Sequence, residues 1–181
     1  MNMNNLQKFF ALLLFLALIG CEDKAPKPAS ELQQSFNTQK VQTFQGIEQL
    51  KSRLAMNPND FGTLSELGDM YFESGQYFEA IQTYDKAVAI NPMCAGCYND
   101  RGLSLHYLGD SNSAIASFEK AVEIDPGYVH AWLSMGYVLV SSGRYQEAIT
   151  PLNKVKELDT SGTLAAEADR FLAVAAQQGV N

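Results

Sequence analysis

Basic residues are scarce in this sequence, and their scarcity argues against one class of partner. Its 181 residues include 13 lysines and arginines against 20 aspartates and glutamates, which gives a net charge of -7. Such a surface repels phosphate backbones, so we expect no binding to nucleic acid. Anionic lipid headgroups would not attract it either, so attachment to a membrane must depend on something other than charge.

Long apolar runs are also lacking. The longest, residues 9–19, has eleven apolar residues, whereas a membrane-spanning helix needs roughly 20. A polar start with the single cation Lys8 precedes it. This length and these flanks are typical of a signal peptide rather than of a membrane span. We therefore predict that residues 1–20 are a targeting segment.

The apolar run ends in Leu18-Ile19-Gly20-Cys21. This tetrapeptide resembles the bacterial lipobox, in which the cysteine receives a diacylglyceryl group and becomes the new N-terminus. The resemblance implies lipidation of Cys21, and several acyl chains at ~0.8 kcal/mol per buried CH₂ anchor a protein stably. The alternative is an ordinary secretory signal in which the cysteine occurs by chance.

The residues after Cys21 bear on location. Enterobacterial sorting rules associate Asp at the next position with the inner membrane, and this chain has Glu22 there. We therefore expect a lipoprotein that faces the periplasm, with the outer membrane favoured over the inner. Residues 22–30 contain two prolines and no large apolar residue, so segment 21–42 is predicted to begin as a solvated tether.

The rest of the chain repeats itself at a spacing of 34 residues, which is the most informative feature of the sequence. Glycines, an Ala-Ile pair, a lysine and several apolar positions recur in three copies over about a hundred residues. The recurring positions include Gly68, Gly102 and Gly136; Gly75, Gly109 and Gly143; Ala80, Ala114 and Ala148; and Tyr84, Phe118 and Leu152.

These positions resemble the tetratricopeptide repeat (TPR), with its Leu-Gly, Tyr, Ala, aromatic, Ala and Pro pattern. The resemblance implies an all-α, right-handed superhelix of helix-turn-helix units, an α-solenoid that ends in a capping helix. It gives these expected parts: a partial repeat helix at 43–60, TPR 1 at 61–94, TPR 2 at 95–128, TPR 3 at 129–162, and a C-terminal capping helix and tail at 163–181.

The residue types explain the pattern physically. Leu64, Leu67 and Tyr71 form an amphipathic stripe at helical spacing. Gly75 and its two counterparts follow the first helix of each unit, where a left-handed residue ends a helix. Pro151 departs from the pattern, because it falls within the second helix of unit three and should kink that helix or shift its start.

In this family the first helices of the units line a concave groove. Transferred position by position, the resemblance implies a partner-binding set of polar and apolar side chains, and its apolar members suit an extended peptide or an amphipathic helix. The alternative is that the capping helix or the N-terminal segment fills the groove. The set comprises Ser65, Asp69, Phe72, Asn99, Leu103, His106, Tyr107, His130, Leu133, Tyr137 and Val140.

A second mode of the family, which clamps a partner's C-terminal carboxylate, is not supported by these residues. The positions that would need cations hold neither lysine nor arginine; they are Ser65, Asp69, Asp100, His130 and Ser134.

Cys94 and Cys97 form a Cys-x-x-Cys pair at the start of a predicted helix. In an oxidising compartment a local disulfide is the leading interpretation. A redox-active pair is the alternative, because a helix N-terminus lowers the pKa of a thiol. Haem attachment would need His after Cys97, where Tyr98 stands, and a zinc site would need two further ligands.

No motif of a nucleophile elbow, a phosphate loop or a metalloprotease occurs, so we predict a protein that is not an enzyme and takes no cofactor, no metal and no small-molecule substrate. The chain resembles TPR lipoproteins that help to assemble outer-membrane β-barrels, pilus secretins or peptidoglycan-enzyme complexes. The predicted function is a lipid-anchored adaptor that binds other envelope proteins. The alternative is a thiol-disulfide or cytochrome-maturation accessory that uses Cys94 and Cys97.

Overall fold

The computed structural model describes residues 29–179. The predicted signal peptide, the lipidation site Cys21 and the start of the predicted tether lie outside the described residues. Contacts divide the chain after residue 39, and residues 40–179 belong to the unit that carries the repeats.

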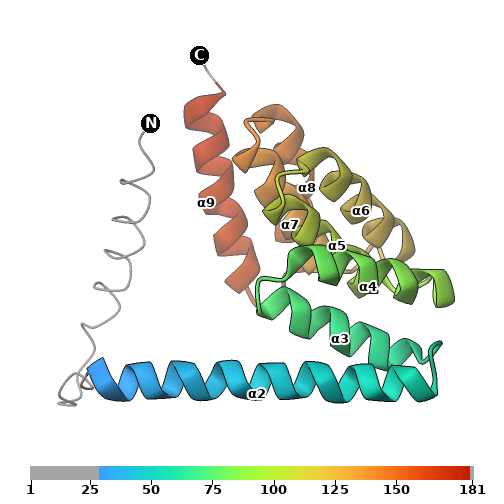
Figure 1. Ribbon diagram of the computed structural model, residues 1–181. Coiled ribbons are helices and arrows are strands. Elements are labelled where there is room, and N and C mark those ends of the chain that lie inside the picture. Colours follow the sequence, from blue (N-terminus) through green and yellow to red (C-terminus); the bar gives the residue numbers. More distant parts are fainter. Residues whose placement is uncertain (1–28, 180–181) are drawn as a thin grey trace. The chain divides into compact units, whose positions relative to one another are not determined.

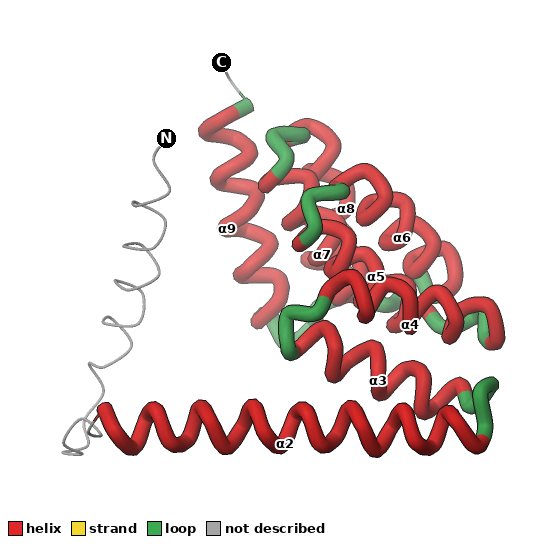
Figure 2. Tube along the Cα trace, in the orientation of Figure 1, coloured by secondary structure: helices red, strands yellow, loops and turns green. Residues whose placement is uncertain are grey.

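The described residues are helical throughout, with short turns and no strand, so the all-α fold class is confirmed (Figures 1 and 2). The helices are α2 (Ala29–Met56), α3 (Phe61–Glu73), α4 (Tyr77–Ile90), α5 (Ala95–Tyr107), α6 (Ser111–Ile124), α7 (Val129–Ser141), α8 (Tyr145–Leu158) and α9 (Thr163–Gln178).

The repeat is visible in the helix boundaries. The first helices α3, α5, α7 and α9 begin 34 residues apart, and so do the second helices α4, α6 and α8. The last part of α2 occupies the place of a second helix in a preceding unit, and α2 reaches back without a break to Ala29. Part of segment 21–42 is therefore helical and continuous with the expected partial repeat helix.

Glycine turns separate the two helices of each unit. Gly75, Gly109 and Gly143 have φ of 76°, 91° and 75°, which is the left-handed region that glycine enters without steric cost. The predicted role of these glycines is confirmed. Each turn returns the chain so that the second helix packs on the first, as in the pairs α3 with α4 and α5 with α6.

A second glycine lets the paired helices approach closely. A Cβ atom at Gly102 would lie 2.6 Å from the ring of Phe118, which is completely buried on α6. Gly68 and Gly136 are in the same relation to Tyr84 and Leu152. The position that follows in this series on α9 is Arg170, which is exposed, since no helix follows α9 within the described residues.

Two clusters of buried side chains hold the stack together. One joins Ile47 and Leu50 of α2 to α3, α4 and Cys97 of α5. The other joins α6, α7 and α8 to Ala168 of α9. The two clusters meet at α5, because its Cys97 belongs to the first cluster and its Leu103 and Leu105 pack against the second. The core thus runs along the array, as expected of a solenoid.

Pro151 does not act entirely as predicted. Helix α8 contains it as an interior, buried residue and begins at Tyr145, in register with the starts of α4 and α6. The expected shift of the helix start is wrong, because residues 145–150 already form helix before the proline ring is reached. Within the part of the chain that the structure describes, no helix is long and apolar enough to cross a membrane.

Candidate protein-binding face

The helices α3, α5, α7 and α9 are neighbours in series, since α3 contacts α5, α5 contacts α7 and α7 contacts α9. We call the surface that they form the first-helix face. All the residues predicted to bind a partner lie on α3, α5 or α7.

Three aromatic rings meet at the α3–α5 end of this face. Tyr77 and Tyr107 stack with their ring centroids 4.7 Å apart and an angle of 12° between the rings. Phe72 lies 5.7 Å from the first ring and 5.8 Å from the second. Tyr107 remains 52% exposed. We call these three residues the aromatic patch.

Tyr77 was missed by the sequence analysis because it opens a second helix, whereas only first-helix positions were considered. Its counterparts in the repeat are Ser111 and Tyr145, so this position does not require an aromatic residue. An aromatic side chain at such a position, next to the last turn of the following first helix, is the signal that would have identified it.

The other end of the face is covered in part by the capping helix. The ring of Tyr137 lies 5.6 Å from that of Phe171 on α9, and it also meets His106 at 5.3 Å. Core packing half-buries four of the predicted partner-binding residues in this region, namely Leu103, Leu133, Tyr137 and Val140. Leu164 and Leu172 of α9 pack against the same cluster. Among residues 29–179, the part of the face that stays open is therefore the α3–α5 end.

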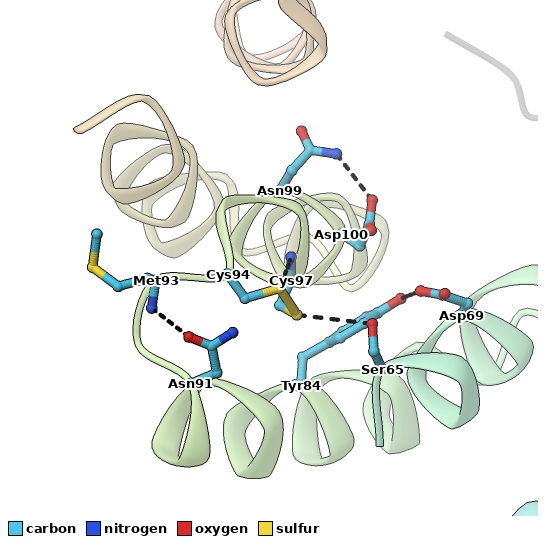
Figure 3. Close-up of a disulfide and its surroundings, with 9 residues drawn as sticks. All are labelled: Ser65, Asp69, Tyr84, Asn91, Met93, Cys94, Cys97, Asn99 and Asp100. Atoms are coloured by element: carbon cyan, nitrogen blue, oxygen red, sulfur yellow. Dashed lines mark hydrogen bonds between the residues drawn. A yellow bond between two sulfur atoms is a disulfide. The ribbon is translucent and has the colours of Figure 1, made fainter. Parts of the chain in front are cut away.

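The polar residues of the predicted set divide by burial. Asp69 and His130 are exposed, and the Asp69 carboxylate accepts a hydrogen bond of 2.7 Å from the hydroxyl of Tyr84. Asn99 corrects the prediction, because it is only 4% exposed and packs inside the array rather than at its surface. Its Nδ2 donates to Asp100 Oδ1 at 2.9 Å (Figure 3).

Burial around Asp100, close to the negative charge of Asp69, makes this part of the face unfavourable for a further negative charge. The pKa of Asp100 is raised to about 6, first by burial and then by the negative charge of Asp69, while the amide of Asn99 and the charge of His130 act in the opposite direction. Burial also lowers the pKa of His106. The polar part of the face is acidic, and a partner's carboxylate would be repelled there.

A disulfide joins Cys94 and Cys97 at the start of α5, with the Cα atoms 5.3 Å apart (Figure 3). Cys94 is the N-cap of the helix, and its sulfur accepts the backbone N–H of Cys97 at 3.1 Å. The Cys97 sulfur lies 3.9 Å from the Ser65 hydroxyl, and Cys97 is only 2% exposed. The disulfide thus closes the first turn of α5, and the buried Cys97 packs in the same cluster as Leu64 and Leu67 of α3.

Comparisons with known proteins agree with this architecture. One family model, described as TPR repeat, matches residues 68–109, and a second, described as tetratricopeptide repeat, matches residues 105–173. The sequence matches no curated protein.

Solved structures show the same fold. The TPR2B domain of yeast Sti1, in its complex with pHsp70, is 26% identical with a TM-score of 0.63, over 65% of this chain and 97% of that one. A crystal structure of MamA is 21% identical with a TM-score of 0.65, over 86% of this chain and 96% of that one. The first TPR of Spaghetti (RPAP3), bound to the HSP90 peptide SRMEEVD, is 24% identical with a TM-score of 0.62, over 67% of this chain and 94% of that one.

The two family models together reach from residue 68 to residue 173 and follow the helix pairs of the structure. With its 34-residue helix pairs, glycine turns and continuous core, the chain is a tetratricopeptide-repeat protein.

Proposed function

We propose that this protein is a lipid-anchored adaptor of the bacterial envelope, and that the α3–α5 end of its first-helix face binds a peptide or a helix of a partner protein. The observation that carries the proposal is the aromatic patch. Its rings are held in place by one another, yet Tyr107 keeps half of its surface open to solvent. Exposed aromatic side chains of this kind are favoured anchors in protein interfaces.

The similar structures support a binding role. The TPR2B domain of yeast Sti1 was solved in its complex with pHsp70, and the first TPR of Spaghetti was solved bound to an HSP90 peptide. The ligand of this chain should differ in charge, because the peptide SRMEEVD is acidic and the polar part of this face contains Asp69 and Asp100. We expect an apolar or aromatic segment without a carboxylate terminus.

The anchor is supported by the sequence alone. Leu18-Ile19-Gly20-Cys21 follows the apolar run at the position that a lipobox requires, and Glu22 favours the outer membrane over the inner. On this proposal the repeats face the periplasm and recruit another envelope protein, and the protein has a binding role rather than a catalytic one.

Two experiments test the two halves of the proposal. For the anchor, cells are fed an alkyne-labelled fatty acid, and the label should be incorporated by the wild-type chain but not by Cys21→Ser. Labelling of both chains alike would refute lipidation at this residue.

For the binding face, the tagged protein is purified from envelopes after chemical crosslinking. The Tyr107→Ala variant should lose an envelope partner that the wild type retains, while Ile149→Ala, at an exposed apolar site of α8, should keep it. Equal recovery with both variants would contradict the assignment of the face.

A further inference from the structure

A surface cavity of about 410 Å³ is bounded by α6, α7 and α8 and shares no residue with the aromatic patch. Its volume falls within the range of ~300–1,000 Å³ that is typical of ligand pockets. The lining combines apolar side chains with three acids and one arginine. The lining residues that matter below are Glu119, Trp132, Met135, Arg144, Glu147 and Pro151.

The preceding repeat unit shows which side chain can occupy the corresponding site, because the counterpart of Met135 in that unit is Arg101. The Nε of Arg101 donates to Asp85 Oδ1 of α4 at 2.6 Å, and its Nη1 donates to Ser117 Oγ of α6 at 2.7 Å. An arginine side chain therefore bridges the second helices of units one and two.

Between units two and three the arginine is missing, and of its two side-chain acceptors only the carboxylate has a counterpart. Glu119 takes the place of Asp85, and Pro151 takes the place of Ser117. Since Pro151 has no N–H, the backbone carbonyl of Glu147 loses its usual donor four residues further along α8. A carboxylate on α6 and a carbonyl on α8 thus belong to residues that line the same cavity.

The cations nearby are engaged with other acids. The guanidinium of Arg144 donates to both carboxylate oxygens of Glu147, at 2.7 and 2.5 Å, and Lys120 pairs with Glu123 at 2.9 Å. Within the described part of the chain, the carboxylate of Glu119 forms no ion pair. The pKa of Arg144 is raised first by its hydrogen bonds to Glu147, and the charge of Glu119 acts in the same direction. The cavity therefore has an unmatched negative charge beside an apolar lining.

We propose that this cavity binds an arginine side chain of a partner protein, in the position that Arg101 occupies within the preceding repeat. The aliphatic stem packs against Trp132 and Met135, and the guanidinium donates to the Glu119 carboxylate and to the Glu147 carbonyl. Arginine suits the site better than lysine, because its planar fork presents several donors to acceptors on two different helices. The protein then has two independent contact surfaces.

The test uses Trp132, the single tryptophan of the chain, as the reporter. The full chain is titrated with N-acetyl-arginine amide while the fluorescence and the indole N–H resonance of Trp132 are followed. A saturable change is expected, and the uncharged analogue N-acetyl-citrulline amide should bind at least about tenfold more weakly because it makes no charge-assisted hydrogen bond. N-acetyl-lysine amide should bind with intermediate affinity.

Variants locate the site. Glu119→Gln should weaken arginine binding about tenfold, since one charge-assisted contact is lost. The matched control Asp85→Asn changes the corresponding acid of the preceding unit, where Arg101 already fills the space, and should leave the affinity unchanged. Met135→Arg supplies an internal arginine and should abolish the response.

Three results would overturn the proposal. They are equal responses to the arginine and citrulline probes, an affinity that Glu119→Gln leaves unchanged, and no response of the wild type up to millimolar probe concentrations. Because Glu119 is an exposed residue, its variant should fold even if Met135→Arg does not.

Discussion

The substitution Phe118→Ala tests whether the array is held together by the packing that the repeat pattern predicts. Phe118 is completely buried, and its ring fills the space above Gly102 that a Cβ atom would otherwise occupy. It belongs to the cluster that connects α6 to α7, α8 and α9. Removing the ring loses its burial and leaves a cavity, which together cost ~3–5 kcal/mol of the free energy of unfolding.

The matched control is Phe78→Ala, the same chemical change at a residue of α4 that is 60% exposed. It should change the free energy of unfolding by no more than ~0.5 kcal/mol, as substitutions at the surface do. The assay is urea unfolding followed by the helical circular dichroism signal. A loss of less than ~1 kcal/mol for Phe118→Ala, or equal losses for both variants, would refute the packing described above.

Three further predictions concern single groups. The folded-state pKa of Asp100 is raised from 3.8 to about 6, so ionisation of this carboxyl destabilises the fold as pH rises through that window. In chemical unfolding, the stability of Asp100→Asn relative to the wild type should therefore increase by ~1–3 kcal/mol between pH 4 and pH 7. A stability difference that does not depend on pH would contradict the raised pKa. The Cys94–Cys97 disulfide closes a very short loop, so its reduction should lower the free energy of unfolding by only ~2 kcal/mol. The melting temperatures with and without a reductant should therefore differ by a few degrees, and complete unfolding on reduction would contradict this small contribution. Gly143→Ala, at φ +75°, should cost ~1 kcal/mol in the same assay, and an unchanged stability would show that the turn can adopt another conformation.

Most of the fold could be predicted from the sequence because its determinants are local and recur three times. The left-handed glycines, and the glycines that lie beneath Tyr84, Phe118 and Leu152, each meet one steric requirement, and that requirement is the same in every unit. Pro151 occurs once, so no second copy showed that a helix could contain it here. Its effect depends on how many residues of α8 are already helical before it, which the sequence pattern does not give.

The candidate site could be predicted less well, because exposure depends on how neighbouring units pack. Asn99 occupies a position that faces the groove in the family, yet it lies inside the array, where its amide bonds to Asp100. Tyr137 was expected to be available, but α9 brings Phe171 against it. Tyr77 joins the aromatic patch through a contact between units, which no analysis of a single unit shows.

Site-specific photocrosslinking in intact cells can show whether a partner protein binds at the α3–α5 end of the first-helix face, as proposed. A photoreactive residue is placed in turn at Tyr107, at Tyr137 and at Ile149 of α8. We expect a strong adduct with one envelope protein from position 107, a weak adduct from position 137 because Phe171 covers it, and none from position 149. Adducts of equal strength from all three positions, or an adduct from position 149 without one from position 107, would contradict the proposal.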